Sequence, residues 1–192
     1  MRVRALIVAA VATAMAAAGS AVALAAASKT VKISDAKQDV TGSLDIQSAS
    51  LRRARDGRLY AVVTLASKVK PETLLSRSGP PGSVCLKLWT DSDVDPRATP
   101  PDRLVCVTAR KKDELRASVL RQADPGVPEL VRSASVRMSK SRRSLVLRFS
   151  QSSLGRPKSL RFAVESTRPG CDRISCIDIA PKGGAVRRFR TR

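Results

Sequence analysis

The chain of 192 residues is strongly basic, with 36 Lys or Arg against 16 Asp or Glu and a formal net charge of +20. It contains no histidine, the side chain best suited to proton transfer near neutral pH, so the familiar serine, cysteine and metal-dependent hydrolase sites are excluded. A high positive charge attracts anionic polymers, but it also keeps an exported protein in solution, and composition alone leaves both explanations open.

The first 25 residues have the features of a secretory signal peptide. A basic start at Arg2 and Arg4 precedes an apolar stretch over 5–18, and small residues on either side of Leu24, at Ala23 and Ala25, provide a cleavage site. The alternative is an uncleaved anchor, although the apolar core is short for a bilayer span of about 20 residues. We expect cleavage, which leaves residues 26–192 as one secreted, extracellular domain with a charge of +18 and no transmembrane segment.

Alternation with period two dominates the rest of the chain and predicts strands that bury one face. Short helical turns are expected at 71–75 and 152–155, and residues 189–192 are expected to be a loose tail. About eight strands with few helices predict an all-β domain, an antiparallel two-sheet β-sandwich. The apolar positions of the strands are Leu59, Ala61, Val63 and Leu65; Val84, Leu86 and Leu88; Leu115, Ala117 and Val119; Leu145, Leu147 and Phe149; and Leu160, Phe162 and Val164.

Four cysteines remain after export to a compartment where thiols oxidise, and three pairings are possible. We favour Cys85 with Cys106 and Cys171 with Cys176. An antiparallel hairpin that sets the first two cysteines opposite each other has one uniformly apolar face, and the second pair closes a short loop. In this register the opposed apolar pairs are Val84 with Val107 and Leu86 with Val105.

One acidic segment interrupts the basic chain, with Asp91, Asp93 and Asp95 at alternate positions and Asp102 at the twelfth. This spacing gathers hard oxygen ligands around calcium. Pro96 stands where an EF-hand loop needs glycine, and aspartate replaces its final glutamate, so an EF-hand is excluded. A looser calcium site in a hairpin loop is a hypothesis, and the alternative is a solvated acidic loop.

Two basic segments in the C-terminal third are candidate contacts for an anionic polymer. Arg142 and Arg143 lie at the tip of a predicted hairpin, and Arg187, Arg188 and Arg190 lie near the C-terminus. Their field suits phosphate-rich wall polymers, acidic glycans or anionic lipid surfaces. The alternative is that both segments are only solvated charges.

Trp89 and Tyr60 are the only large amphipathic rings. A sugar-binding face or a platform for single-stranded nucleic acid usually needs several exposed rings, so their scarcity weighs against both, and no specific nucleic-acid partner is expected. Trp89 lies on the Cys85 side of its strand, and we expect it to be a core residue packed against the disulfide.

A chain without histidine retains two catalytic arrangements, a glycosidase-like carboxylate pair or a Ser and Lys pair. Sequence spacing does not place any two acids across a cleft, so we expect no enzyme and no cofactor other than the hypothetical calcium. The candidate carboxylates are Asp35, Asp39, Asp45, Glu165 and Asp178.

The segment 35–46, with paired aspartates and a Leu-Asp-Ile motif, and the following segment 56–62 resemble the opening of β-sandwich domains in secreted actinobacterial proteins. The segments 153–155 and 178–181 resemble the closing part of the same layout. The resemblance covers most of the mature chain loosely. It implies a β-sandwich, an extracellular compartment and a layout similar to carbohydrate-binding accessory domains, and it brings no catalytic residues.

Together these features predict a secreted, non-catalytic binding or structural module at the cell envelope that contacts anionic wall polymers. One alternative is a carbohydrate-binding module, which requires Trp89 exposed on a sheet face. The other is a carboxylate-dependent extracellular hydrolase, which requires a cleft with two acids.

Overall fold

The computed structural model describes residues 30–36, 40, 42–91, 93–122, 127–171 and 176–191, so the predicted signal peptide lies outside the described residues. Strands and short 3-10 turns make up the regular structure of the described ranges. The strands are β1 Thr30–Ser34, β2 Ile46–Arg53, β3 Arg58–Leu65, β4 Ser83–Trp89, β5 Arg103–Lys111, β6 Glu114–Arg121, β7 Glu129–Met138, β8 Ser144–Ser150, β9 Ser159–Thr167, β10 Ile177–Ala180 and β11 Arg187–Arg190. The turns are η1 Pro71–Leu74, η2 Gln151–Leu154 and η4 Lys182–Gly184.

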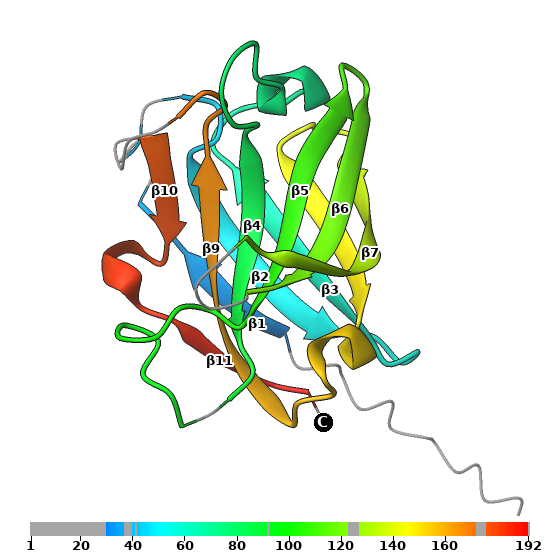
Figure 1. Ribbon diagram of the computed structural model, residues 1–192, viewed down its shortest axis with the longest axis vertical. Helices are drawn as coiled ribbons and strands as arrows, with labels where there is room; N and C mark the ends of the chain where they lie inside the picture. The colour runs from blue at the N-terminus through cyan, green and yellow to red at the C-terminus, as the bar shows by residue number, and fades with distance from the viewer. Residues whose placement is uncertain are drawn as a thin grey trace, which may run out of the picture.

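The strands form one antiparallel sheet in the order β1-β2-β3-β8-β7-β6-β5-β4-β9-β10, with β11 also paired to β9. The decisive strand is β7, because residues 129–134 pair with β6 and residues 135–138 pair with β8. The strands β1, β2, β3 and β8 are therefore continuous with β6, β5, β4, β9 and β10 through β7. The whole sheet curls nearly into a barrel (Figure 1). The all-β, antiparallel prediction is confirmed. The two-sheet β-sandwich, which the actinobacterial resemblance also implied, is wrong.

The core fills the inside of the curled sheet, and the predicted alternation places it there. Leu59, Ala61, Val63 and Leu65 of β3 are all fully buried. A curled sheet buries one face of each strand just as a sandwich does, which is why alternation does not distinguish the two. Both predicted helical turns are confirmed as 3-10 turns, and each buries one leucine, Leu74 in η1 and Leu154 in η2.

The two ends of the sheet meet without strand pairing between them in the described residues, and polar contacts join them instead. These contacts link the β1–β2 side to the β9–β11 side. They include the hydrogen bonds Ile46 N–H to Asp178 Oδ2 at 2.6 Å, Ser166 Oγ to the Leu44 carbonyl at 2.6 Å, Lys182 N–H to Asp35 Oδ1 at 3.1 Å and Arg53 Nη1 to the Thr191 carbonyl at 2.7 Å.

The C-terminal segment is a strand and not the loose tail that its sequence suggested. Phe189 of β11 is 1% exposed and lies opposite Leu160 of β9, with Arg188 and Arg190 exposed on either side of it. One buried ring in a short basic segment is too little alternation to reveal a strand. That ring and the antiparallel pairing of β11 with β9 hold the segment against the sheet.

Both predicted disulfides are confirmed. Cys85 pairs with Cys106 across β4 and β5, in the predicted register, and Cys171 pairs with Cys176. The two bonds indicate an oxidising environment. Of the helical segments that the structure describes, none is long and apolar enough to cross a membrane.

Candidate functional site

The predicted calcium segment forms the loop between β4 and β5, and its carboxylates are engaged within that loop. Asp91 and Asp95 each accept a hydrogen bond from the backbone N–H two residues further on, at 2.9 and 3.0 Å. Asp102 accepts hydrogen bonds from the backbone N–H and the hydroxyl of Thr90. No group of three carboxylates or thiolates in the described ranges could hold a metal ion, so Asp91, Asp93, Asp95 and Asp102 give the calcium hypothesis no support.

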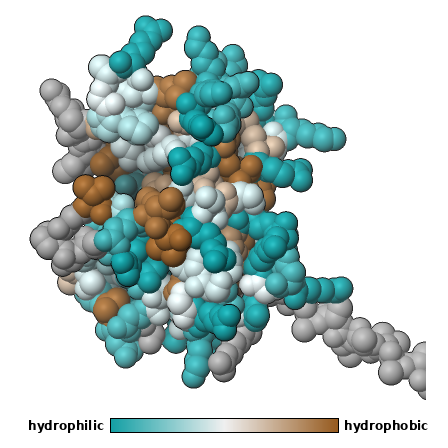
Figure 2. Space-filling model, turned by 45° about the vertical axis from the view of Figure 1, so that its right-hand side comes forward, coloured by the Kyte–Doolittle hydropathy of each residue, from teal (hydrophilic) through white to brown (hydrophobic). Residues whose placement is uncertain are grey.

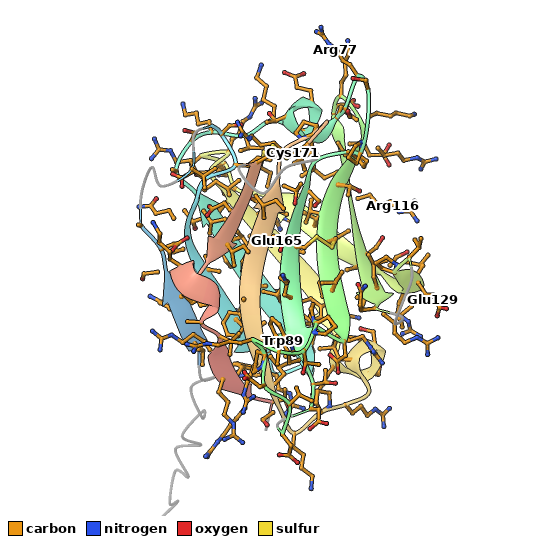
Figure 3. The ribbon with its side chains drawn as sticks, turned by 60° about the vertical axis from the view of Figure 1, so that its left-hand side comes forward. Arg77, Trp89, Arg116, Glu129, Glu165 and Cys171 are labelled. Atoms are coloured by element: carbon orange, nitrogen blue, oxygen red, sulfur yellow. A yellow bond between two sulfur atoms is a disulfide. The ribbon has the colours of Figure 1, made fainter. Side chains whose placement is uncertain are left out.

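This loop covers Trp89 instead. The indole Nε1 donates a hydrogen bond to the Thr99 carbonyl at 2.8 Å, and the ring is 5% exposed. The expected burial of Trp89 is confirmed, but the ring is not part of the core cluster. Its neighbour Leu88 belongs to that cluster, whereas Trp89 lies towards the loop (Figure 3). The exposed ring that a carbohydrate-binding module requires is therefore not present at this position.

The two predicted basic segments lie far apart along the strand direction, one beyond each end of β3. The carbonyls of Arg142 and Arg143 accept hydrogen bonds from the residues at and just after the end of β3. The end of β11 lies beside Arg53, which is opposite the start of β3. Because β3 has eight residues, roughly 20–25 Å separates the segments. The structure therefore does not combine Arg142 and Arg143 with Arg187, Arg188 and Arg190 into one site.

A different set of cations lies together on the outside of the sheet, and we call it the arginine–tyrosine face. It consists of Lys32 on β1, Arg52 on β2, Tyr60 on β3, Arg148 on β8 and Arg137 on β7. These side chains point outward because each alternates along its strand with residues that face the core. Adjacent strands therefore carry cations on the same side of the sheet.

Tyr60 is at the centre of this face. The register sets it directly opposite Arg52 on one side and Arg148 on the other. The Cζ atoms of the two guanidinium groups lie 4.5 and 5.5 Å from the ring centroid. Cation–π attraction of this kind holds both guanidinium groups near the ring while leaving their N–H donors available.

The cations of the face have few acidic partners. Lys32, Arg52 and Arg137 form no ion pair with any described residue. Arg148 pairs with Asp56 at 2.9 Å, and its buried Nε has no hydrogen-bond partner among the described residues. The face therefore carries a net positive charge with unused hydrogen-bond donors.

Two hollows lie in the face. One, of about 380 Å³, is lined by Arg52, Tyr60, Arg137 and Arg148 together with serine, valine and methionine side chains. The other, of about 390 Å³, lies beside Lys32 and is lined mainly by serine, threonine and valine. Hydroxyl groups and guanidinium groups both donate hydrogen bonds to anionic oxygens, so both hollows suit an anion.

Asp56 is an acid in contact with the face, through its ion pair with Arg148. The backbone N–H of Arg58 donates a hydrogen bond to Asp56 at 3.0 Å, and this contact is the main reason why the pKa of the carboxyl is below its ordinary value. The hydrogen bond and charge of Arg148 lower the pKa further. Asp56 is therefore ionised and competes with any anionic ligand for Arg148.

A larger hollow, of about 580 Å³, lies near η1 and the tip of the β5–β6 hairpin. Its charged lining is mixed, and Lys70 pairs with Glu72 at 3.3 Å. The lining cations are Lys70, Lys112 and Arg142, and the lining acids are Glu72, Asp113 and Glu114. With both signs present and partly paired, this hollow has no strong preference for one ligand charge.

The candidate catalytic carboxylates have structural contacts in the described residues. Glu165 pairs with Lys87 at 2.8 Å, and Asp45 and Asp178 are buried where the ends of the sheet meet. Asp35 accepts a hydrogen bond at the same place. Asp39 lies outside the described residues.

Sequence reasoning missed the cations of the arginine–tyrosine face. Their only signal was that they occupy the polar positions of alternating strands. That signal is common to every solvated sheet face. Tyr60 also lies beside Arg148 only because β3 pairs with β8, and these strands are far apart in the chain.

Comparison of the chain with protein-family models, with curated proteins and with solved structures finds no match.

Proposed function

We propose that this protein is an extracellular, non-catalytic module that binds anionic polymers of the cell envelope through the arginine–tyrosine face. The observation that supports this most is the row in which Arg52 and Arg148 flank Tyr60, with Lys32 and Arg137 on the same side of the sheet. The predicted signal peptide and the two disulfides support an extracellular location.

The chemistry of arginine favours phosphate-rich or carboxylate-rich chains. A guanidinium group offers a planar fork of N–H donors that matches two oxygens of one phosphate or carboxylate. Adjacent strands lie about 4.8 Å apart, so Arg52 and Arg148, two strands apart, present their donors at intervals along a line. An extended polyanion lying across β2, β3 and β8 would meet them in succession.

The face is less suited to a neutral sugar. A sugar-binding platform uses the open face of an aromatic ring, whereas guanidinium groups already lie over the ring of Tyr60. Trp89 is covered by its own loop. Electrostatic attraction is therefore the main source of affinity that we propose, and affinity should fall steeply as salt rises.

The experiment measures binding of the secreted protein to inorganic polyphosphate, as a defined polyanion, at low and high salt. A triple variant of the face, Arg52→Gln, Arg137→Gln and Arg148→Gln, removes three charges from one surface. A matched control, Arg187→Gln, Arg188→Gln and Arg190→Gln, removes the same charge from β11. Because both variants have the same net charge, their difference reports position alone.

We expect the face variant to lose affinity by at least about tenfold, the equivalent of 1.4 kcal/mol, and the β11 variant to stay within about threefold of the wild type. Equal losses in both variants would mean that net charge alone attracts the polymer. Binding by the wild type that does not change with salt, or no binding at low salt, would also contradict the proposal.

A further inference from the structure

The first half of β7 is an open strand edge. Residues 129–134 pair with β6 on one side, and β8 pairs with β7 only from Ser135 to Met138. Residues 129–133 are all exposed, and Glu129 lies on the flank of the molecule, pointing away from its body (Figure 3). Among the described residues, no strand covers the free side of this segment. An open edge presents unpaired backbone N–H and C=O groups to another chain.

Apolar side chains gather at this edge. Val127, Leu130 and Val131 are 85%, 57% and 43% exposed, and they are three of the four large apolar residues that the structure describes as exposed. Leu130 lies opposite Leu120 of β6, which lies opposite Leu104 of β5, so a stripe of leucines leads across the outer side of the sheet to the edge. Figure 2, which turns this side forward, shows apolar surface among hydrophilic side chains.

The edge has only part of the usual protection against pairing. Natural edge strands are commonly blunted by lysine, proline, bulges or inward-pointing charges, and the segment Glu129-Leu130-Val131-Arg132 has neither lysine nor proline. Its protection consists of a bulge at Val131, between the pairs Val119–Arg132 and Leu120–Leu130, and of Arg132, which lies opposite the buried Val119.

The charges at the edge are complementary to themselves. If two copies pair antiparallel about a point between Leu130 and Val131, Glu129 of each copy lies opposite Arg132 of the other. Leu130 then lies opposite Val131 of the second copy. Within one copy, Glu129 lies opposite Arg121 of β6 and forms an ion pair with it at 2.5 Å, and Arg132 lies opposite Val119. Arg121 and Val119 are two positions apart, so both charged side chains point to the same side of the sheet, where Glu129 of one copy can contact Arg132 of the other as well as its own Arg121. Opposite charges directly across an antiparallel pair stabilise it.

We propose that a second copy of this chain binds at this edge, β7 to β7, and forms a symmetric dimer with a continuous sheet. The contact is isologous, because each copy contributes the same residues, and it closes without further growth. The edge residues do not belong to the arginine–tyrosine face, which stays open on both copies.

The test is sedimentation of the secreted protein over a wide range of concentration. We expect a reversible monomer–dimer equilibrium in the wild type. Leu130→Lys places two like charges in the contact and should raise the dissociation constant by at least about tenfold. The matched control is Ile179→Lys, at a residue of β10 that is also exposed, by 37%, and it should dimerise like the wild type.

A charge exchange tests the register. Glu129→Arg alone and Arg132→Glu alone place like charges opposite each other, and each should weaken the dimer by about tenfold. The triple variant Arg121→Glu/Glu129→Arg/Arg132→Glu restores opposite charges both across the contact and within each copy, where Glu129 pairs with Arg121, and should regain the wild-type dissociation constant within about threefold. Circular dichroism of each variant establishes that the monomer is folded.

A wild type that stays monomeric at every concentration would overturn the proposal. So would a dimer that Leu130→Lys does not weaken, because such a dimer uses another surface. A triple variant that stays as weak as the single variants would overturn the proposed register.

Discussion

The carboxylate of Asp178 accepts a hydrogen bond from the backbone N–H of Ile46 at 2.6 Å, although the two residues are 132 positions apart. Both are buried, at 3% and 0% exposure. This bond joins β10 to the start of β2, where the two ends of the curled sheet meet. Closure of the sheet therefore depends on single side-chain contacts and not on a backbone ladder.

Removal of this carboxylate should destabilise the whole domain. Asp178→Ala leaves the buried N–H of Ile46 without its acceptor, which costs about 1–3 kcal/mol. The free energy of unfolding in urea measures the effect. Asp113→Ala removes an exposed carboxylate at the β5–β6 turn and should change stability by less than about 0.5 kcal/mol. Equal effects of the two substitutions would show that the Asp178 contact does not hold the ends of the sheet together.

Trp89 should be shielded in the native protein. It is the only tryptophan and is 5% exposed, so its fluorescence reports on this one position. We expect weak quenching by acrylamide in the folded protein, strong quenching after unfolding, and no change in emission on addition of neutral oligosaccharides. Strong quenching in the native state, or a spectral response to neutral sugars, would favour the carbohydrate-binding alternative.

Asp56 should contribute to the acid sensitivity of the fold. Because its pKa is lowered in the folded protein, chiefly by the hydrogen bond from the Arg58 N–H, its contribution is present above the unfolded pKa of about 4. The contribution is lost as pH falls through that value towards the folded pKa. Asp56→Asn should therefore lose less stability than the wild type between pH 5 and pH 3.

The control for this comparison is Asp113→Asn, at an acid that forms no ion pair with any described residue. It should retain the wild-type difference in unfolding free energy between the two pH values. An unchanged difference in Asp56→Asn would mean that the contact with Arg58 is not maintained in solution.

The Asp56→Asn substitution should also strengthen polymer binding. Asp56 holds Arg148 at 2.9 Å, so Asp56→Asn releases this guanidinium and adds one positive charge to the face. We expect affinity for polyphosphate to rise by about two- to fivefold at low salt, and the gain to shrink at high salt. Asp113→Asn adds the same charge at a distant turn, and an equal gain there would show that Arg148 has no special part in binding.

The sequence was informative wherever the evidence was local. Alternation identified the central strands, and the opposed apolar pairs beside Cys85 and Cys106 were sufficient to predict both the disulfide and its register. The turns at Pro71 and at Leu154 were visible from a leading proline and a closing glycine. Each of these signals depends on residues that are neighbours in the chain or across one hairpin.

The sequence was uninformative where the answer depended on distant pairing. What makes one curled sheet here, and not two separate sheets, is that β7 pairs with both β6 and β8. The alternation along β7 is the same in either case. The arginine–tyrosine face was missed for the same reason, because Tyr60 and Arg148 become neighbours only through the pairing of β3 with β8. Basic segments in the sequence point to Arg142 and Arg187, but the fold places these two segments at opposite ends of the strands.

The most direct test of the proposed polymer-binding face is a backbone amide chemical-shift map of the ¹⁵N-labelled secreted protein titrated with polyphosphate. We predict that the largest shifts fall on β2, β3 and β8 around Arg52, Tyr60 and Arg148, and that β11 is little affected. Largest shifts at residues 139–143 or at 187–190, or small shifts spread evenly over all basic residues, would contradict this account.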